Sequence, residues 1–564
     1  MTKISRKQFL YRSAMGTGSV LLFSGLGLSA CGKADGYITA KTTYGKIRGI
    51  RERGVNIFKG IPYAGRVSGD RRFNRPAPLD PWTGVRDALR LGNPAIQAPN
   101  QTYGIDEPEY SEDCLFLNVW TPANDNKKRP VMFYNHGGGF GSGSGGSAAQ
   151  DGANLARYFD VVVVETNHRL NIFGFLYLGE IAGDEYNTSG NNGMLDIVDG
   201  LNWVNQNIAE FGGDPGNVMI FGESGGGSKT SCLYAMPSAA DYFNKASIES
   251  GPGIRMIPLE SAAETANLVF RELGIDKKEW RRILELPADE IFGIQGKVQR
   301  AAAQLAASQP PSGERSRGLR IGGFGAMVDD ISLPVNPFDP TPPEISRNKP
   351  LMVGWNEDEY NFMLLMGGGS DKSLFTMDFD GLEQRLKPRY GDDTQLIIDT
   401  YRRNRPDESP TDIFIEISSV TMMGLGSIEI AEKKMVQRGA PAYLYNFGYK
   451  SEVKIPGTDY PIGTPHAMDI AFKFNNVRDD GLENASGMAG SRPESYKASL
   501  NYAELWTTFA RTGEPGAKDQ PEWPPYDLDK RPTYRIDTEC KVIWDRNKPE
   551  RELWTSLGYI AENQ

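Results

Sequence analysis

The sequence predicts an α/β fold built on a large central sheet of mostly parallel strands. Three consecutive stretches support this class: a strand over residues 161–164, a helix over 195–211 and a strand over 218–221. Strand, helix and strand in this order form a crossover unit, which places two strands parallel in one sheet. The strand Val161–Val164 is an unbroken β-branched run, which indicates burial on both sides. We therefore expect helices on both faces of the sheet.

Shorter strands and tight turns precede this unit. Residues 36–39, 45–50 and 55–58 predict hairpins, so we expect a small antiparallel region at the N-terminal side of the sheet. Further strands are expected at residues 115–120, 131–135, 351–355 and 442–447.

Residues 301–325 are rich in Ala, Gly, Ser and Pro, which predicts a surface insertion or a flexible loop. A domain linker has a similar composition. The candidate site residues described below lie on both sides of this stretch, so a linker would divide the site. We therefore expect one domain over residues 31–564.

Charge and cysteine content exclude several classes of protein. The 564 residues include 62 basic and 72 acidic residues, for a net charge of -10, and no Lys/Arg-rich block of the kind that binds phosphates. Nucleic acid is therefore not an expected partner. Four cysteines are too few for a disulfide framework in a chain of this length. No His, Cys and carboxylate cluster has ligand spacing, so neither a metal nor an organic cofactor is expected.

The N-terminus has the layout of a signal peptide over residues 1–30. Basic residues up to Arg12 precede an uncharged stretch from Ser13 to Ala30. A transmembrane helix is the alternative, but the stretch contains four Gly and four Ser and is barely long enough to span a bilayer. Residues 5–10 resemble a twin-arginine export motif with Lys7 in the second basic position, which leaves twin-arginine and general secretion both open.

Leu28-Ser29-Ala30-Cys31 resembles a bacterial lipobox, in which cleavage before Cys31 exposes the thiol that receives lipid. The alternative is ordinary cleavage in this region, with Cys31 incidental. The lipobox predicts an exported protein that is anchored to the bacterial membrane through lipid on Cys31, on the periplasmic or cell-surface side.

A candidate nucleophile lies between a predicted strand and a predicted helix. Residues 222–226 form the pattern G-x-S-x-G around Ser224, directly after the strand at 218–221. This motif places a serine hydroxyl on a strained strand-to-helix turn, close to a helix N-terminus that favours developing negative charge. The pattern alone is common, and a glycine-rich turn with an idle serine is the alternative.

A second glycine motif, His136-Gly137-Gly138-Gly139-Phe140, follows the strand predicted at 131–135. Consecutive glycines leave backbone N–H groups unshielded, which suits a hole that binds a tetrahedral oxyanion. A flexible loop is the alternative. The position of this glycine motif upstream of Ser224 matches the arrangement found in esterases.

A serine nucleophile needs a general base with a pKa near neutrality, and the chain has three histidines. His136 belongs to the glycine loop and His168 follows the strand at 161–164, so both precede Ser224. Only His466 satisfies the order nucleophile, acid, base that accompanies the motif. The acid is expected after the strand at 351–355, where Glu357, Asp358 and Glu359 offer three carboxylates that spacing alone does not separate.

With these motifs, the chain resembles the type-B carboxylesterase/cholinesterase family of α/β-hydrolases over nearly its whole mature length. The segments that carry the resemblance are residues 58–64, 112–118, 136–140, 167–170, 211–215 and 222–226. The resemblance implies an α/β-hydrolase fold, with Glu359 as the acid of a triad through the pattern N-x-D-E. It also implies that the amides of Gly138, Gly139 and Gly225 form the oxyanion hole.

Three positions depart from the family pattern. Gly225 stands where the family usually has Ala. His168 stands where the family usually has Tyr, and we expect His168 to have a structural or supporting role. Cys114 normally pairs with an upstream cysteine that is missing from residues 93–97, so we expect no disulfide there. Cys232 and Cys540 are expected to be isolated buried thiols.

The sequence therefore predicts a serine carboxylic-ester hydrolase that forms an acyl-enzyme: Ser224 attacks the ester, His466 moves the proton and Glu359 orients His466. The expected partner is a small-molecule ester whose acyl and alcohol groups the sequence does not name. A catalytically silent cholinesterase-like binding or adhesion protein is one alternative. Amidase or lactonase activity on the same residues is another.

Overall fold

The structure is a computed structural model that describes residues 36–99, 107–307, 321–367, 369–477 and 487–560. The predicted signal peptide, the lipobox and Cys31 lie outside the described residues.

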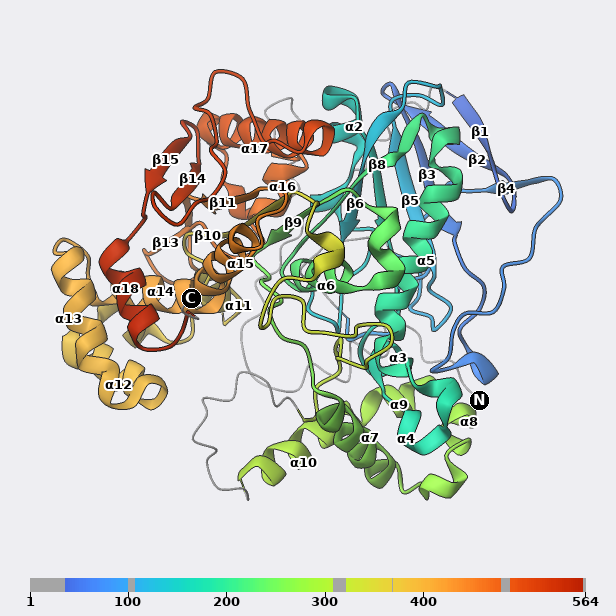
Figure 1. Cartoon of the computed structure of the whole chain (residues 1–564), viewed down its shortest axis with the longest axis horizontal. Coiled ribbons are helices and arrows are strands. Elements are labelled where there is room, and N and C mark those ends of the chain that lie inside the picture. Colours follow the sequence, from blue (N-terminus) through green and yellow to red (C-terminus); the bar gives the residue numbers. More distant parts are fainter. Residues whose placement is uncertain (1–35, 100–106, 308–320, 368, 478–486, 561–564) are drawn as a thin grey trace.

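A large sheet runs through the whole molecule (Figure 1). In spatial order its strands are β1 (Gly36–Thr42), β2 (Gly45–Glu52), β3 (Val55–Pro62), β5 (Phe116–Thr121), β7 (Val162–Thr166), β6 (Arg129–Asn135), β8 (Gly213–Glu223), β9 (Lys245–Glu249), β10 (Leu351–Asn356), β11 (Ala442–Phe447), β14 (Pro532–Ile536) and β15 (Lys541–Trp544). The short strand β4 (Val85–Asp87) pairs with β2.

In this order each strand from β7 to β14 is parallel to the next. At one edge β1, β2, β3, β5 and β7 pair antiparallel in succession, and at the other edge β15 pairs antiparallel with β14. The predicted fold class is therefore confirmed: a large, mostly parallel sheet with a small N-terminal antiparallel region.

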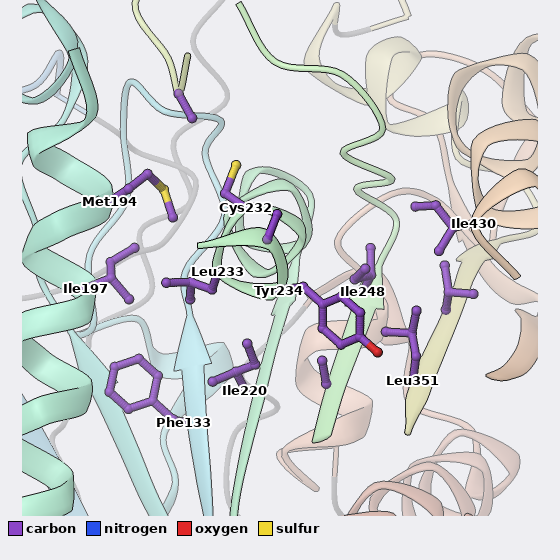
Figure 2. Packing of buried hydrophobic residues seen from close by; sticks show 14 of the residues in the cluster. Phe133, Met194, Ile197, Ile220, Cys232, Leu233, Tyr234, Ile248, Leu351 and Ile430 are labelled. Carbon is purple, nitrogen blue, oxygen red and sulfur yellow. The ribbon is translucent and has the colours of Figure 1, made fainter. Parts of the chain in front are cut away.

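Helices cover both faces of the sheet because the side chains of its central strands alternate between two cores. Val131 and Phe133 of β6 belong to one core, and Met132 and Tyr134 belong to the other. The first core contains α5 (Asn192–Asn207), α6 (Gly225–Ala235) and α15 (Leu425–Val436). The second contains α2 (Ala153–Phe159), α16 (Asp469–Lys473) and α17 (Pro493–Thr512). Figure 2 shows Phe133 and Ile220 of the sheet facing Ile197 of α5 and Leu233 of α6.

A third core lies outside the sheet, among the helices that connect β9 to β10 (Figure 1). These helices are α7 (Leu259–Leu273), α8 (Arg282–Glu285), α9 (Ala288–Gly293) and α10 (Gln295–Ala307), and they pack with α3 (Asn171–Phe175) and α4 (Gly179–Ala182). The prediction of a loop over 301–325 is wrong for residues 301–307. These residues form the end of α10, because alanine has a high helix propensity. Ala301 and Ala302 are buried on the same helix as Val298.

The remaining helices follow β10. They are α11 (Asn361–Met366), α12 (Phe379–Tyr390), α13 (Thr394–Asn404), α14 (Pro410–Ser419) and α18 (Lys548–Ser556), and a small separate sheet pairs β12 (Ser451–Lys454) with β13 (Pro461–Gly463). A short π-helical segment at Val420–Gly424 joins α14 to α15. Among the described residues, only this continuous run (Pro410–Val436) is long and apolar enough to cross a membrane. Because 78% of its apolar window is buried in the protein, it is a core helix.

Candidate active site

The candidate nucleophile lies at a sharp turn between a central strand and a helix. Strand β8 ends at Glu223, α6 begins at Gly225, and Ser224 between them has φ 58° and ψ -122°. A positive φ is unusual for a serine and costs about 1–3 kcal/mol, a strain that is typical of functional sites. The backbone N–H of Ser224 donates to the carbonyl oxygen of Glu249 at 2.8 Å, which holds the turn in place. The strained turn expected from G-x-S-x-G is present.

The glycines around this turn are required by the close approach of strand β6. A Cβ added to Gly222 would lie 2.6 Å from the carbonyl oxygen of Asn135, and one added to Gly226 would overlap the same oxygen. Only glycine fits at these two positions.

The second glycine loop lies directly against the start of α6. Gly138 and Gly139 have φ of 81° and 63°, a left-handed backbone that glycine adopts without strain. The N–H of Ser142 donates to the carbonyl oxygen of Gly138 at 3.0 Å and closes the loop. A Cβ on Gly225 would overlap the backbone N and Cα of Gly139. The departure at position 225 therefore has a physical reason: the loop occupies the space that an alanine methyl group needs.

Ser224, His466 and Glu359 form one chain of hydrogen bonds. The Oγ of Ser224 lies 2.8 Å from Nε2 of His466, and Nδ1 of His466 lies 2.5 Å from Oε2 of Glu359. His466 is 6% exposed and Glu359 is fully buried, so water hardly competes for these bonds. Ser224 and Glu359 follow β8 and β10, whose carboxyl ends lie at the same end of the parallel sheet. His466 reaches them from the loop after β13, a strand of the small separate sheet.

The structure separates the three neighbouring carboxylates by their partners. Only Glu359 bonds with His466. Asp358 accepts hydrogen bonds from Nζ of Lys450 at 2.6 Å and from the N–H of Thr464 at 2.7 Å, and so holds the loop that leads to His466.

Glu357 is held by cations instead. Its carboxylate pairs with Lys450, Arg535 and Arg546. Burial alone would raise the pKa of Glu357, but these three cations lower the pKa to about 2. Glu357 therefore stays ionised, and the partners of its carboxylate are these cations.

The second carboxylate oxygen of Glu359 is also fixed. It accepts hydrogen bonds from Oγ of Ser250 at 2.5 Å and from the N–H of Asn356 at 2.7 Å. The side-chain amide of Asn356 donates to the carbonyl oxygen of Pro465 at 2.8 Å and to Asp469 at 3.0 Å. Asn356 thus links the acid to the loop that carries His466. Such supporting bonds hold the carboxylate and the imidazole in a single arrangement.

A further carboxylate faces the same imidazole. The Oε1 of Glu223 lies 3.3 Å from Nε2 of His466, and Glu223 is 1% exposed. Burial alone would lower the pKa of His466, but the carboxylates of Glu223 and Glu359 outweigh burial and raise it above the usual value of an imidazole. Sequence reasoning missed Glu223 as a site residue, although it is the variable position of G-x-S-x-G directly before Ser224.

Buried ion pairs lie behind the imidazole. Lys473 pairs with Glu249 and with Asp469, and all three side chains are fully buried. Trp506 donates its indole N–H to the same Glu249 carboxylate at 2.5 Å. The side of the site that faces the second core is therefore packed and polar, with one buried lysine shared by two carboxylates.

The other two histidines do not touch the nucleophile. The rings of His136 and His168 stack on each other, with centroids 4.5 Å apart and planes inclined by 21°. Burial, with the nearby Lys229 charge, lowers the pKa of both well below the usual value, so both rings are neutral at pH 7. Of the three imidazoles, only that of His466 forms a hydrogen bond with Ser224.

The described cysteines are free. Cys114, Cys232 and Cys540 are buried thiols, and burial raises the pKa of each. In the parts of the chain that the structure describes, no group of three or more His, Cys, Asp or Glu side chains is arranged to hold a metal ion.

Comparison with known proteins identifies the family of the chain. The model of the carboxylesterase family matches residues 37–554. The chain belongs to the carboxylesterase family. Carboxylesterases hydrolyse carboxylic esters, and this chain is a carboxylic ester hydrolase.

Named relatives cover nearly the whole chain. The para-nitrobenzyl esterase of Bacillus subtilis is 33% identical over 522 residues, which are 92% of this chain and 98% of that protein. The structure of the Geobacillus stearothermophilus carboxylesterase superposes with a TM-score of 0.75 at 34% identity and covers 92% of this chain and 99% of its own. An esterase from Clostridium hathewayi, described as able to hydrolyse aliphatic aromatic polyesters, gives the same TM-score at 28% identity, with 93% and 99% covered.

Proposed function

We propose that this carboxylesterase cleaves its ester through a triad of Ser224, His466 and Glu359. The observation that carries the proposal is the hydrogen-bonded chain from Ser224 Oγ through the His466 ring to Glu359, with links of 2.8 and 2.5 Å. In this arrangement a weak nucleophile has a base within bonding reach, and the base is oriented by a buried acid.

Each step follows from the position of these atoms. Ser224 Oγ attacks the ester carbonyl while Nε2 of His466 takes the hydroxyl proton, and the carbonyl becomes a tetrahedral oxyanion. His466 then returns the proton to the alcohol oxygen, the carbon–oxygen bond breaks and the acyl group remains on Ser224. A water molecule repeats the sequence with His466 as its base, and the acid is released.

We assign the oxyanion hole to the backbone amides of Gly138, Gly139 and Gly225. The positive φ of both loop glycines and the close approach of Gly139 to Gly225, the residue after Ser224, support this assignment. Preorganised N–H donors at this position stabilise the charge that develops in the transition state.

The test is hydrolysis of p-nitrophenyl acetate by wild type and Ser224→Ala. We expect kcat to fall by about 10³-fold or more in the variant. Ser228→Ala is the matched control, since Ser228 lies one turn further along α6 and its Oγ only donates to the carbonyl oxygen of Gly251 at 3.3 Å. Equal rates for wild type and Ser224→Ala would contradict the proposed triad. A panel of esters of rising acyl length, with an amide and a lactone, would define the substrate class.

We also propose that the mature protein is exported and anchored to the membrane by lipid on Cys31. The support is the lipobox Leu28-Ser29-Ala30-Cys31 at the end of an uncharged segment that follows basic residues. Mass spectrometry of the mature N-terminus should show an acylated Cys31, and Cys31→Ser should move the esterase from the membrane fraction to the soluble one. An unmodified N-terminus at another residue would remove the anchor.

A further inference from the structure

Lys229 is a fully buried lysine on the helix that begins at the candidate nucleophile. Its Nζ donates a hydrogen bond of 2.9 Å to the backbone carbonyl oxygen of His136. His136 is the first residue of the glycine loop and directly precedes Gly137. The hydrogen bond therefore joins the nucleophile helix α6 to the start of the loop to which the oxyanion hole is assigned.

The loop contacts the same face of α6 at two points. Gly225 and Lys229 are four residues apart and so lie on one side of the helix. Gly225 packs against the backbone of Gly139 so closely that a Cβ would overlap it, and Lys229 bonds with His136 one turn further on. The loop is thus fixed by contact near its middle and by a hydrogen bond at its start.

Within the described part of the chain, the other buried lysines have more partners than Lys229. Each has at least two acceptors: Lys245 bonds with Asn217 and Ala510, Lys433 with Phe338 and Glu429, Lys434 with Ser346, Arg347 and Gln437, and Lys473 with Glu249 and Asp469. Among the described residues, Lys229 has one hydrogen-bond acceptor and no carboxylate within ion-pair distance, although an ammonium has three N–H groups. Because a buried and incompletely hydrogen-bonded amine is costly, its presence on the nucleophile helix points to a role there.

Lys229 lies near three rings. Its Nζ lies 5.9 Å from the centre of the Phe140 ring, at the far end of the glycine loop. The imidazoles of His136 and His168 are neutral, for the reason given above. Burial lowers the pKa of Lys229 to about 7, so the amine keeps N–H donors in either protonation state.

We propose that Lys229 is a positioning residue of the oxyanion hole, which holds the His136 carbonyl and thereby sets the glycine loop against Ser224 and Gly225. The inference rests on the proposed function, since it concerns the hole assigned there. Lys229 acts through the loop and does not touch the reacting atoms. Its loss should therefore weaken transition-state binding more than substrate binding.

The test compares Lys229→Met, which keeps the apolar stem and removes the donor, with Lys434→Met. Lys434 is a matched control: it is fully buried, burial likewise lowers its pKa to about 7, and it donates to the carbonyl oxygens of Ser346 and Arg347. The Ser346 carbonyl also accepts a hydrogen bond from Tyr234 at the far end of α6, about 14 Å along the helix from Gly225.

For Lys229→Met we expect kcat to fall by about 10- to 100-fold with little change in KM. Affinity for a trifluoromethyl ketone, whose adduct with the nucleophile carries the same oxyanion, should fall in parallel. Lys434→Met should lower the melting temperature but leave kcat and inhibitor affinity as in wild type.

A folded Lys229→Met enzyme with wild-type kcat and inhibitor affinity would overturn the proposal. If the Met variant does not fold, Lys229→Leu is measured against the same two outcomes. Ser224→Ala is measured in the same experiment. Full activity of Ser224→Ala would contradict the proposed triad. An inactive Ser224→Ala together with an unaffected Lys229→Met would contradict only the role of Lys229.

Discussion

Oε1 of Glu223 lies 3.3 Å from Nε2 of His466, so the nitrogen that faces Ser224 also faces a second buried carboxylate. Burial raises the pKa of the Glu223 carboxyl to about 8. In its ionised form this carboxylate stabilises the protonated imidazole and, with Glu359, raises the pKa of His466. A general base works only when it is deprotonated. Activity is therefore gained as the pH rises through the pKa of His466, and the acid limb of kcat/KM should lie above the value of a free imidazole, about 6.5.

Glu223→Gln should move that acid limb to lower pH. The substitution keeps the size of the side chain and removes the negative charge, so the protonated imidazole loses a stabilising neighbour and its pKa falls. We expect a shift of about one pH unit or more in the pH profile of kcat/KM. Asp358→Asn is the control, since Asp358 bonds with Lys450 and Thr464 and should leave the limb in place. An unmoved or raised limb in Glu223→Gln would contradict the electrostatic role.

Glu359→Gln should be far more damaging to kcat than Asp358→Asn. The Glu359 carboxylate accepts the Nδ1–H of His466, and an amide in its place neither fixes that tautomer nor stabilises the imidazolium. We expect a fall of about 10³- to 10⁴-fold in kcat for Glu359→Gln. Asp358→Asn keeps an oxygen to accept the N–H of Thr464 and should lose less than about tenfold. The reverse ranking would move the acid to Asp358.

Gly225→Ala should lower activity, even though alanine is the residue expected from the family resemblance. In this chain the methyl group would overlap the backbone of Gly139 and displace the glycine loop. A displacement of about 1 Å at such a site costs up to about 100-fold in kcat, so we expect a loss of about 10- to 100-fold. Gly293→Ala, in α9 with open space around the added Cβ, should leave kcat unchanged. A Gly225→Ala enzyme as active as wild type would show that the loop yields freely.

Residues that belong to a local sequence motif could be selected as site candidates from the sequence alone. The strand-to-helix turn at Ser224 has its own glycine signature, and His466 is the one histidine that follows it. The choice of Glu359 over Asp358 needed the family resemblance, because three adjacent carboxylates differ only in where the loop directs them.

The sequence did not predict the hydrogen-bond partners that come from elements without a clear sequence pattern. Strand β9 supplies the Glu249 carbonyl and leads to Ser250, yet its sequence Lys-Ala-Ser-Ile-Glu has no clear strand pattern. It is a strand because it is buried between β8 and β10. Lys229 is similar: nothing in a helix sequence indicates that a lysine reaches a backbone carbonyl of a distant loop. These contacts depend on tertiary packing, which local sequence does not encode.

The motif that contains His168 also carries a buried ion pair on which stability should depend. Arg169 and Asp196 bond through Nη2 and Oδ1 at 2.7 Å and through Nε and Oδ2 at 2.8 Å, and both side chains are almost completely buried. Asp196→Ala leaves the guanidinium without its counter-charge, which should cost about 3–5 kcal/mol of folding free energy. The measurement is the melting temperature, which should fall sharply.

The double variant Arg169→Met/Asp196→Leu should recover most of that loss, because it removes the uncompensated charge along with its partner. Asp70→Ala is the control for charge removal at an exposed pair, since Arg66 and Asp70 are largely exposed and contribute little to stability. A double variant as unstable as Asp196→Ala alone would mean that the loss comes from packing around α5 and not from the buried charge. In that case Asp196→Asn, which keeps the volume and removes the charge, should melt near wild type. If the charge is responsible, Asp196→Asn should also be destabilised.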